Sequence, residues 1–142
     1  MTATDRGGLA IYTDGASRGN PGPAAYAYLF VRDGEVVHEA SGLAGVTTNN
    51  TAEYMAVINA LREARSWTDG PVDLYSDSEL VVRQLRGEYR VNKEHLRALR
   101  EEVFALAGAF SAVTFSSVRR SDRYVSRADA LCNLELDRRE RG

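Results

Sequence analysis

A chain of 142 residues with 44% hydrophobic and 27% charged side chains has the length and balance of one globular domain. The formal net charge of −2 gives no sign of a strongly basic protein, although basic side chains gather in residues 83–93 and 119–127. One cysteine cannot form an internal disulfide, and no apolar run is long enough to span a bilayer. We therefore expect a cytoplasmic protein without a membrane partner.

The first part of the chain reads as three strands. Residues 9–14 and 24–33 are rich in aromatic and apolar side chains, as is typical of strands. The Asp-Gly pair at 33–34 predicts a tight turn into a third strand over residues 35–43. These segments predict an antiparallel meander.

Helical spacing begins after this meander. Apolar residues from Thr51 onward predict a helix that ends near Trp67. The expected elements that follow are a strand over 72–76, helices over 77–87 and 92–108, a strand over 112–118 and a helix over 125–140. Three strands followed by this alternation imply an α/β domain with a mixed sheet. We expect one domain over 1–142, with mobile tails at 1–8 and 138–142.

Two acidic residues follow expected strands. Asp14 ends the first strand, where it could begin an Asx-turn. Asp77 ends the fourth strand and opens a helix, where Ser76 and Glu79 have the spacing of a capping box. Each acid therefore has a local structural alternative to a functional role.

Two further acids lie early in expected helices. Glu53 continues the apolar stripe of its helix, with a capping role after Asn50 as the alternative. Asp129 lies in the first turns of the last helix, where the helix dipole favours a negative charge. Strand ends and helix starts gather at one edge of an open sheet, so the four carboxylates are expected to meet there. Divalent cations would offset their repulsion, and a pair of such ions can cleave a phosphodiester.

Four segments together resemble the motifs of type 1 ribonuclease H: YTDGASRGNPGPAAYAY, TTNNTAEYMAVINAL, YSDSELVVRQL and ADALCNLELD. The resemblance extends from about residue 9 to residue 137. It implies an α/β, ribonuclease H-like five-stranded mixed sheet, three antiparallel strands followed by two parallel ones, flanked by helices. It also implies an endonuclease that hydrolyses the RNA strand of an RNA/DNA hybrid and leaves 3′-hydroxyl and 5′-phosphate ends.

The resemblance assigns site residues by their positions in these motifs. The catalytic and metal-binding acids are Asp14, Glu53, Asp77 and Asp129, and Gly15 lies at the metal. Two Mg²⁺ ions are implied with substrate bound, with Mn²⁺ as a substitute. The implied substrate-binding residues are Asn20, Thr48, Asn49, Asn50, Lys93, Arg119 and Arg120. A monomer that binds RNA/DNA hybrid is expected, of the short form without a basic arm or a separate hybrid-binding domain.

The chain also departs from the family pattern. Many relatives carry a histidine in the loop before the last acid, whereas the histidines here are His38 and His95, for which we expect solvent-facing structural roles. Arginines, among them Arg123, occupy that loop and can hold a phosphate but cannot shuttle a proton. Two alternatives remain: a nuclease of the same fold that also cuts double-stranded RNA, and a non-catalytic binding module, which the four retained acids disfavour.

Overall fold

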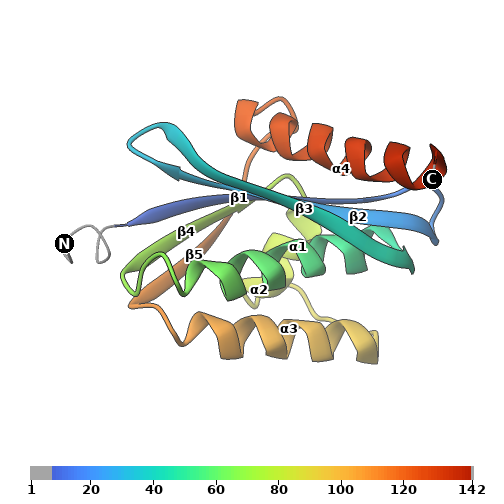
Figure 1. The fold of residues 1–142 in the computed structure, drawn as a ribbon. Coiled ribbons are helices and arrows are strands. Elements are labelled where there is room, and N and C mark those ends of the chain that lie inside the picture. Colours follow the sequence, from blue (N-terminus) through green and yellow to red (C-terminus); the bar gives the residue numbers. More distant parts are fainter. Residues whose placement is uncertain (1–7, 142) are drawn as a thin grey trace.

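A mixed sheet of five strands lies at the centre of this computed structural model, which describes residues 8–141 (Figure 1). The elements in chain order are β1 Leu9–Ser17, β2 Gly22–Arg32, β3 Glu35–Thr47, α1 Asn49–Ala64, β4 Pro71–Ser76, α2 Glu79–Leu85, α3 Glu94–Ala107, β5 Ala112–Ser117 and α4 Arg123–Arg141. No helix in this part of the chain has the length and apolar character needed to cross a membrane.

The strand order is β3-β2-β1-β4-β5. The pairs β1–β2 and β2–β3 are antiparallel, and the pairs β1–β4 and β4–β5 are parallel. Asp33 and Gly34 both have positive φ angles, 52° and 78°, which is the backbone that a tight hairpin turn requires. The parallel neighbour of β1 needs a crossover connection, and α1 supplies it. The predicted fold class is confirmed.

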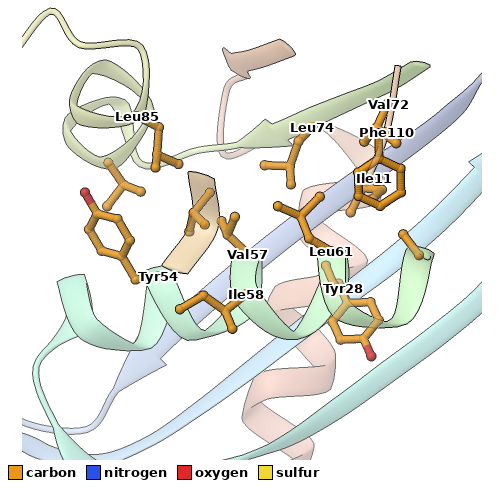
Figure 2. Packing of buried hydrophobic residues seen from close by; sticks show 14 of the residues in the cluster. Ile11, Tyr28, Tyr54, Val57, Ile58, Leu61, Val72, Leu74, Leu85 and Phe110 are labelled. Atoms are coloured by element: carbon orange, nitrogen blue, oxygen red, sulfur yellow. The ribbon is translucent and has the colours of Figure 1, made fainter. Parts of the chain in front are cut away.

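Helices cover both faces of the sheet. On one face, α1 with α2 and α3 buries a core in which Val57 and Leu61 of α1 lie against Ile11 of β1 and Leu74 of β4 (Figure 2). On the other face, α4 is the one helix within residues 8–141 (Figure 1). Side chains alternate along a strand, so β1 contributes Ile11 to the first core and its neighbours to the α4 face.

The core under α4 is small. Ala25 and Ala27 of β2 are fully buried there against Ala128, Cys132 and Leu136 of α4. Because alanine side chains are short, α4 lies close to the strands. Tyr124 in the first turn of α4 lies over Tyr12 of β1, with the ring centroids 4.6 Å apart, and later turns of α4 reach Arg18 just beyond the end of β1.

Several expectations differ from the structure at element ends. β1 continues beyond Asp14, β3 extends to Thr47, and α4 extends to Arg141, while the mobility expected for 138–142 stays a prediction. The expected tail at 1–8 lies outside the described residues except for Gly8, which is exposed and precedes β1. β1 pairs with β2 as far as Ser17, and β2 pairs with β3 as far as Thr47, with a register shift between Ala24 and Ala25.

The solvent-facing role expected for His38 is wrong. Its Nε2 atom lies 2.9 Å from Oε2 of Glu63, and its side chain is 28% exposed. The ring lies 5.2 Å from that of Phe30 and 5.4 Å from that of Trp67, measured between centroids. Glu63 also accepts a hydrogen bond from the Tyr28 hydroxyl at 2.5 Å, so this group links β2 and β3 to α1.

Candidate active site

The parallel pairing of β1 and β4 brings the first two acids together. Tyr12 pairs with Tyr75 and Thr13 with Ser76, and the next residues along the two segments are Asp14 and Asp77. Carboxylate oxygens of Asp14, Asp77 and Glu53 lie within 4.8 Å of one another. Asp129 is exposed and lines the same cleft, which has a volume of about 410 Å³. The structure thus brings three acids into one cluster and places the fourth at its rim.

Glu53 is held by a strand and not by its own helix. Its Oε1 atom accepts a hydrogen bond from the amide of Gly15 at 2.9 Å, and the residue is 8% exposed. The N-cap of α1 is Thr48, whose hydroxyl accepts from the amide of Thr51 at 3.2 Å. The capping alternative for Glu53 is therefore wrong.

Gly15 allows this contact because β1 and α1 touch through their backbones. A Cβ atom at Gly15 would lie 2.3 Å from the carbonyl carbon of Ala52 and 2.4 Å from the amide nitrogen of Glu53. No side chain fits in such a space, and glycine is the residue that permits close backbone approach. The missing side chain thus sets the distance between Glu53 and the end of β1.

Asp14 lies inside β1, paired with Ala27 of β2, so the Asx-turn alternative does not hold. The residue is 4% exposed, and its buried Oδ2 atom has no hydrogen-bond partner among residues 8–141. Burial, followed by the negative charges of Asp77 and Asp129, raises the pKa of Asp14 to about 8. A buried carboxylate without a partner is costly unless a cation compensates it.

The same causes act on Glu53. Burial and then the charges of Asp14 and Asp77 raise its pKa well above the usual value, against the hydrogen bond from Gly15, which lowers it. A hard divalent cation takes carboxylate oxygens as ligands and would offset this repulsion. The donor set and the unpartnered oxygen of Asp14 therefore fit a divalent metal.

Asp77 precedes α2 and does not cap it. The N-cap is Ser78, whose hydroxyl accepts from the amide of Val81 at 3.3 Å. The Ser76 hydroxyl accepts from the amide of Ser78 at 3.0 Å, so the capping box given as the alternative is not formed. The carboxylate of Asp77 is free to face the cleft, where Nε of Arg120 lies 3.5 Å from its Oδ2.

The two loop arginines differ in position. Arg120 lines the cleft, although its side chain is 91% exposed. Arg119 is also exposed but does not line the cleft. The structure therefore brings one of these two predicted substrate-binding residues to the acids.

The other predicted substrate-binding residues line a second hollow beside the cleft. The Asn20 side chain accepts from the amide of Asn49 at 3.0 Å, and the Asn49 side chain accepts from the amide of Ser17 at 2.8 Å. These bonds join the β1–β2 loop to the start of α1. The hollow has a volume of about 230 Å³ and is lined by Asn20, Thr48, Asn49, Asn50, Lys93, His95 and Leu96. Asn49 and Asn50 line the cleft as well.

His95 is a site candidate that the sequence did not indicate. It is exposed, as expected, but it lines this second hollow and its Nε2 lies 3.3 Å from the Thr51 hydroxyl. The signal available in the sequence is its position two residues after Lys93, at the start of an amphipathic helix. That signal could place His95 near Lys93 but could not bring α3 against the start of α1.

Comparisons with known proteins agree with this geometry. The RNase H family pattern matches residues 6–118. Ribonuclease HI of Halobacterium salinarum is 43% identical over 135 residues, which cover 94% of this chain and 67% of the relative. The crystal structure of RNase H1 from that archaeon superposes with a TM-score of 0.88 at 41% identity, covering 93% of this chain and 99% of the other.

Two further relatives extend the comparison. LC11-RNase H1, solved in complex with RNA/DNA hybrid, has a TM-score of 0.85 at 35% identity and covers 92% of this chain and 97% of its own. The bifunctional protein Rv2228c of Mycobacterium tuberculosis is 36% identical over 131 residues, which are 91% of this chain but 35% of that protein. Because the family pattern covers most of the chain and the archaeal relative matches nearly all of it, the chain belongs to the RNase H family of ribonucleases.

Proposed function

We propose that the protein is a metal-dependent endonuclease that hydrolyses the RNA strand of RNA/DNA hybrids and leaves 3′-hydroxyl and 5′-phosphate ends. The observation that carries this proposal is the cluster of Asp14, Glu53 and Asp77, whose carboxylate oxygens lie within 4.8 Å of one another. Membership in the RNase H family and the hybrid complex of LC11-RNase H1 support the choice of substrate.

Asp14, Glu53, Asp77 and Asp129 would hold the metal, for which we propose two Mg²⁺ ions with substrate bound and Mn²⁺ as a substitute. When bound, such ions lower the pKa of the attacking water and stabilise charge on the leaving oxygen. The protein supplies the fixed carboxylates, and Gly15 serves the site through its hydrogen bond to Glu53. The guanidinium of Arg120 lies beside the Asp77 carboxylate at the opening of the cleft, where it can hold a phosphate.

The second hollow is the proposed contact with the hybrid. Its side-chain amides, the Thr48 hydroxyl, Lys93 and His95 offer hydrogen bonds and positive charge to phosphate and sugar. An A-like minor groove displays 2′-hydroxyl groups, which such amides can recognise. Double-stranded RNA displays the same groups, so it is the natural competing substrate.

Four end-labelled duplexes of one sequence test the proposal: RNA/DNA, RNA/RNA, DNA/DNA and DNA with a single ribonucleotide. Each is incubated with Mg²⁺, with Mn²⁺ and with chelator, and the ends of the products are mapped. We expect metal-dependent cleavage confined to the RNA strand of the hybrid. Equal cleavage of RNA/RNA would favour the broader nuclease, and binding without any cleavage would favour a non-catalytic module.

Replacing Arg120 with alanine should lower kcat/KM on the hybrid by about 1.4- to fivefold, the factor that corresponds to about 0.2–1 kcal/mol for an exposed charge pair. Arg119→Ala is the matched control, because it removes the same charge from the same loop and Arg119 does not line the cleft. It should change kcat/KM less. A loss for either variant as large as that for an acid would mean that an arginine, and not the carboxylate cluster, carries the chemistry.

Two expectations from the sequence stay predictions. The monomeric state and the cytoplasmic location are tested by sedimentation of the purified chain and by fractionation of cells that express it.

A further inference from the structure

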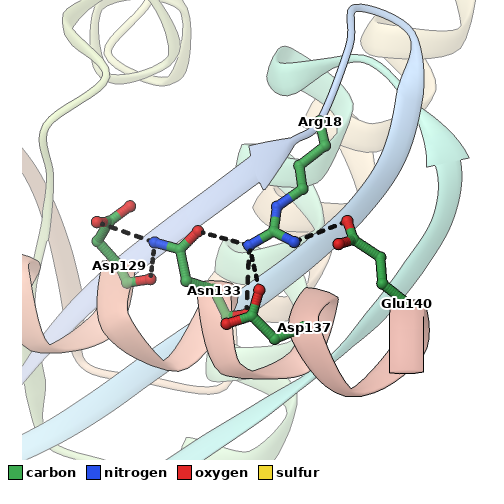
Figure 3. Close-up of polar contacts among 5 residues, drawn as sticks. All are labelled: Arg18, Asp129, Asn133, Asp137 and Glu140. Carbon is green, nitrogen blue, oxygen red and sulfur yellow. Dashed lines mark hydrogen bonds and ion pairs between the residues drawn. The ribbon is translucent and has the colours of Figure 1, made fainter. Parts of the chain in front are cut away.

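Arg18 of the β1–β2 connection joins three residues of α4. Its Nη2 lies 2.8 Å from Oδ1 of Asp137 and 3.2 Å from Oδ1 of Asn133, and its Nη1 lies 2.7 Å from Oε2 of Glu140. Figure 3 shows the guanidinium in the middle of this group, with its acceptors along one side of the helix. The three partners follow helical spacing, so they share one face of α4.

Asn133 continues the chain of contacts to the cleft. Its Nδ2 donates to the carbonyl oxygen of Asp129 at 3.2 Å and approaches Oδ2 of the same residue at 3.4 Å (Figure 3). Asp129 is the acid that lies at the rim of the cleft and is exposed. Within residues 8–141, this carboxylate is reached by the side-chain amide of Asn133 and, when Asp14 is protonated, by a hydrogen bond from Asp14.

The orientation of the Asn133 amide follows from the chemistry of arginine. A guanidinium has donors and no acceptor, so the atom of Asn133 that faces Arg18 must be its oxygen. The amide nitrogen then faces Asp129. Arg18 thus determines which end of Asn133 meets the acid, while Asp137 and Glu140 fix the guanidinium itself.

At its other end, this series of contacts reaches the β1–β2 loop that carries Asn20. Arg18 lies two residues before Asn20, and its backbone amide donates to the carbonyl of Pro23 at 2.8 Å, across the same loop. Asn20 in turn accepts from Asn49 at the second hollow. The contacts therefore connect the proposed hybrid-binding loop with the acid at the cleft rim.

We propose that Arg18 and Asn133 are positioning residues that hold the Asp129 carboxylate toward the cleft and tie its position to the β1–β2 loop. The inference rests on the proposed function for its catalytic consequence, but the contact itself does not. Asp14 and Glu53 are buried and Asp77 directly follows the last residue of β4, whereas Asp129 is exposed and its carboxylate is contacted by Asn133. Partners that orient a ligand typically change affinity or activity by about 10- to 100-fold.

The kinetic arm compares Asn133→Leu, Arg18→Gln and Arg139→Gln. Leucine keeps the size of Asn133 and loses the side-chain hydrogen bonds to Arg18 and Asp129. We therefore expect kcat to fall about tenfold, the smallest loss typical of such partners, because the contact is exposed. Arg18→Gln should lower kcat about threefold, and KM should change less than twofold in both variants. Arg139→Gln removes the same charge from the exposed surface of α4. The Arg139 side chain has no hydrogen bond or ion pair within residues 8–141, so this variant should match wild type.

The second arm needs neither metal nor substrate. In chelator, the side-chain NH₂ resonances of Asn133 are followed by ¹⁵N-correlated NMR in the wild type, Asp129→Asn, Arg18→Gln and Arg139→Gln. We expect the resonances to shift in Asp129→Asn and Arg18→Gln and to stay in place in Arg139→Gln. Unchanged resonances in both of the first two variants would overturn the proposal.

The two arms separate the possible failures. If the wild type cleaves none of the duplexes, the proposed function fails, and the NMR arm still decides whether Arg18 and Asn133 hold Asp129. If the wild type cleaves, full activity of Asn133→Leu overturns the positioning role. A further loss when Asn133→Leu is added to Asp129→Asn also overturns it, because Asn133 would then act through another group.

Discussion

Asp14→Asn is expected to remove nearly all cleavage of the hybrid while making the metal-free protein more stable. The substitution keeps the size of the side chain but removes a charge from a cluster with oxygens within 4.8 Å of one another. Loss of an outer partner alone costs about 10- to 100-fold, so loss of a proposed ligand should cost more than about a hundredfold in kcat/KM. The measurement is hybrid cleavage with Mg²⁺, beside thermal unfolding in chelator.

The stability gained by Asp14→Asn should increase with pH. The pKa of Asp14 is raised to about 8 in the folded protein, against about 3.9 for an unfolded aspartate. The folded state therefore binds more protons between these values, and the wild type loses stability as the pH rises from about 4 to 8. Asparagine does not titrate, so the advantage of Asp14→Asn in chelator should be small at pH 5 and largest above pH 8. An advantage of about 1 kcal/mol would raise the unfolding midpoint by roughly 3–5 °C.

Asp69→Asn is the matched control, since it removes the same charge from an exposed position whose side chain has no hydrogen bond or ion pair within residues 8–141. It should leave cleavage and the pH profile unchanged. Cleavage that survives both Asp14→Asn and Asp77→Asn would show that the acid cluster does not carry the reaction.

Gly15→Ala should damage both the fold and the proposed site. The added methyl group would lie 2.3–2.4 Å from backbone atoms of Ala52 and Glu53, so α1 must move away from β1. Overpacking against atoms that can shift costs about 1–3 kcal/mol, and backbone atoms yield less than side chains, so we expect a loss of at least about 2 kcal/mol. Urea unfolding measures this loss, and kcat/KM should fall with it because the bond from the Gly15 amide to Glu53 is displaced.

Gly8→Ala serves as the control for this substitution. A Cβ there would lie 3.7 Å from the carbonyl oxygen of Pro71, an ordinary contact distance, so stability and cleavage should stay near wild type. If Gly15→Ala has wild-type stability and activity, the backbone contact between β1 and α1 does not set the site.

The sequence predicted the order and type of the elements because these follow from local periodicity. The aromatic and apolar side chains of β2 and the Asp-Gly turn mark a hairpin, and the apolar spacing from Ala56 to Ala64 marks a helix, whatever the rest of the chain does. Helix caps were harder. Thr48 and Ser78 cap α1 and α2, whereas the sequence left Glu53 and Asp77 as alternatives, since neighbouring polar residues compete for the same amides.

The meeting of the four acids could be expected from topology, because strand ends and helix starts share one edge of the sheet. The difference in burial among the four acids could not be expected from topology. Glu53 is buried because Gly15 admits the backbone of α1, and Asp129 stays exposed because α4 passes the cleft at its rim. The contact between Arg18 and Asn133 joins residues that are 115 positions apart, and no local pattern predicts such a pair.

Cys132 in the small core under α4 can be used to measure local opening of the structure. It is the chain's single thiol, it is fully buried, and its Sγ donates to the carbonyl oxygen of Asp14 at 3.5 Å. Burial, and then the nearby carboxylates, raise the pKa of this thiol, so the reactive thiolate is scarce in the closed protein. A thiol reagent reaches Cys132 only when α4 separates from β1, and its rate of labelling therefore reports local opening directly beneath the candidate active site. Labelling of Cys132 thus measures how often α4 separates from β1 beneath the cleft.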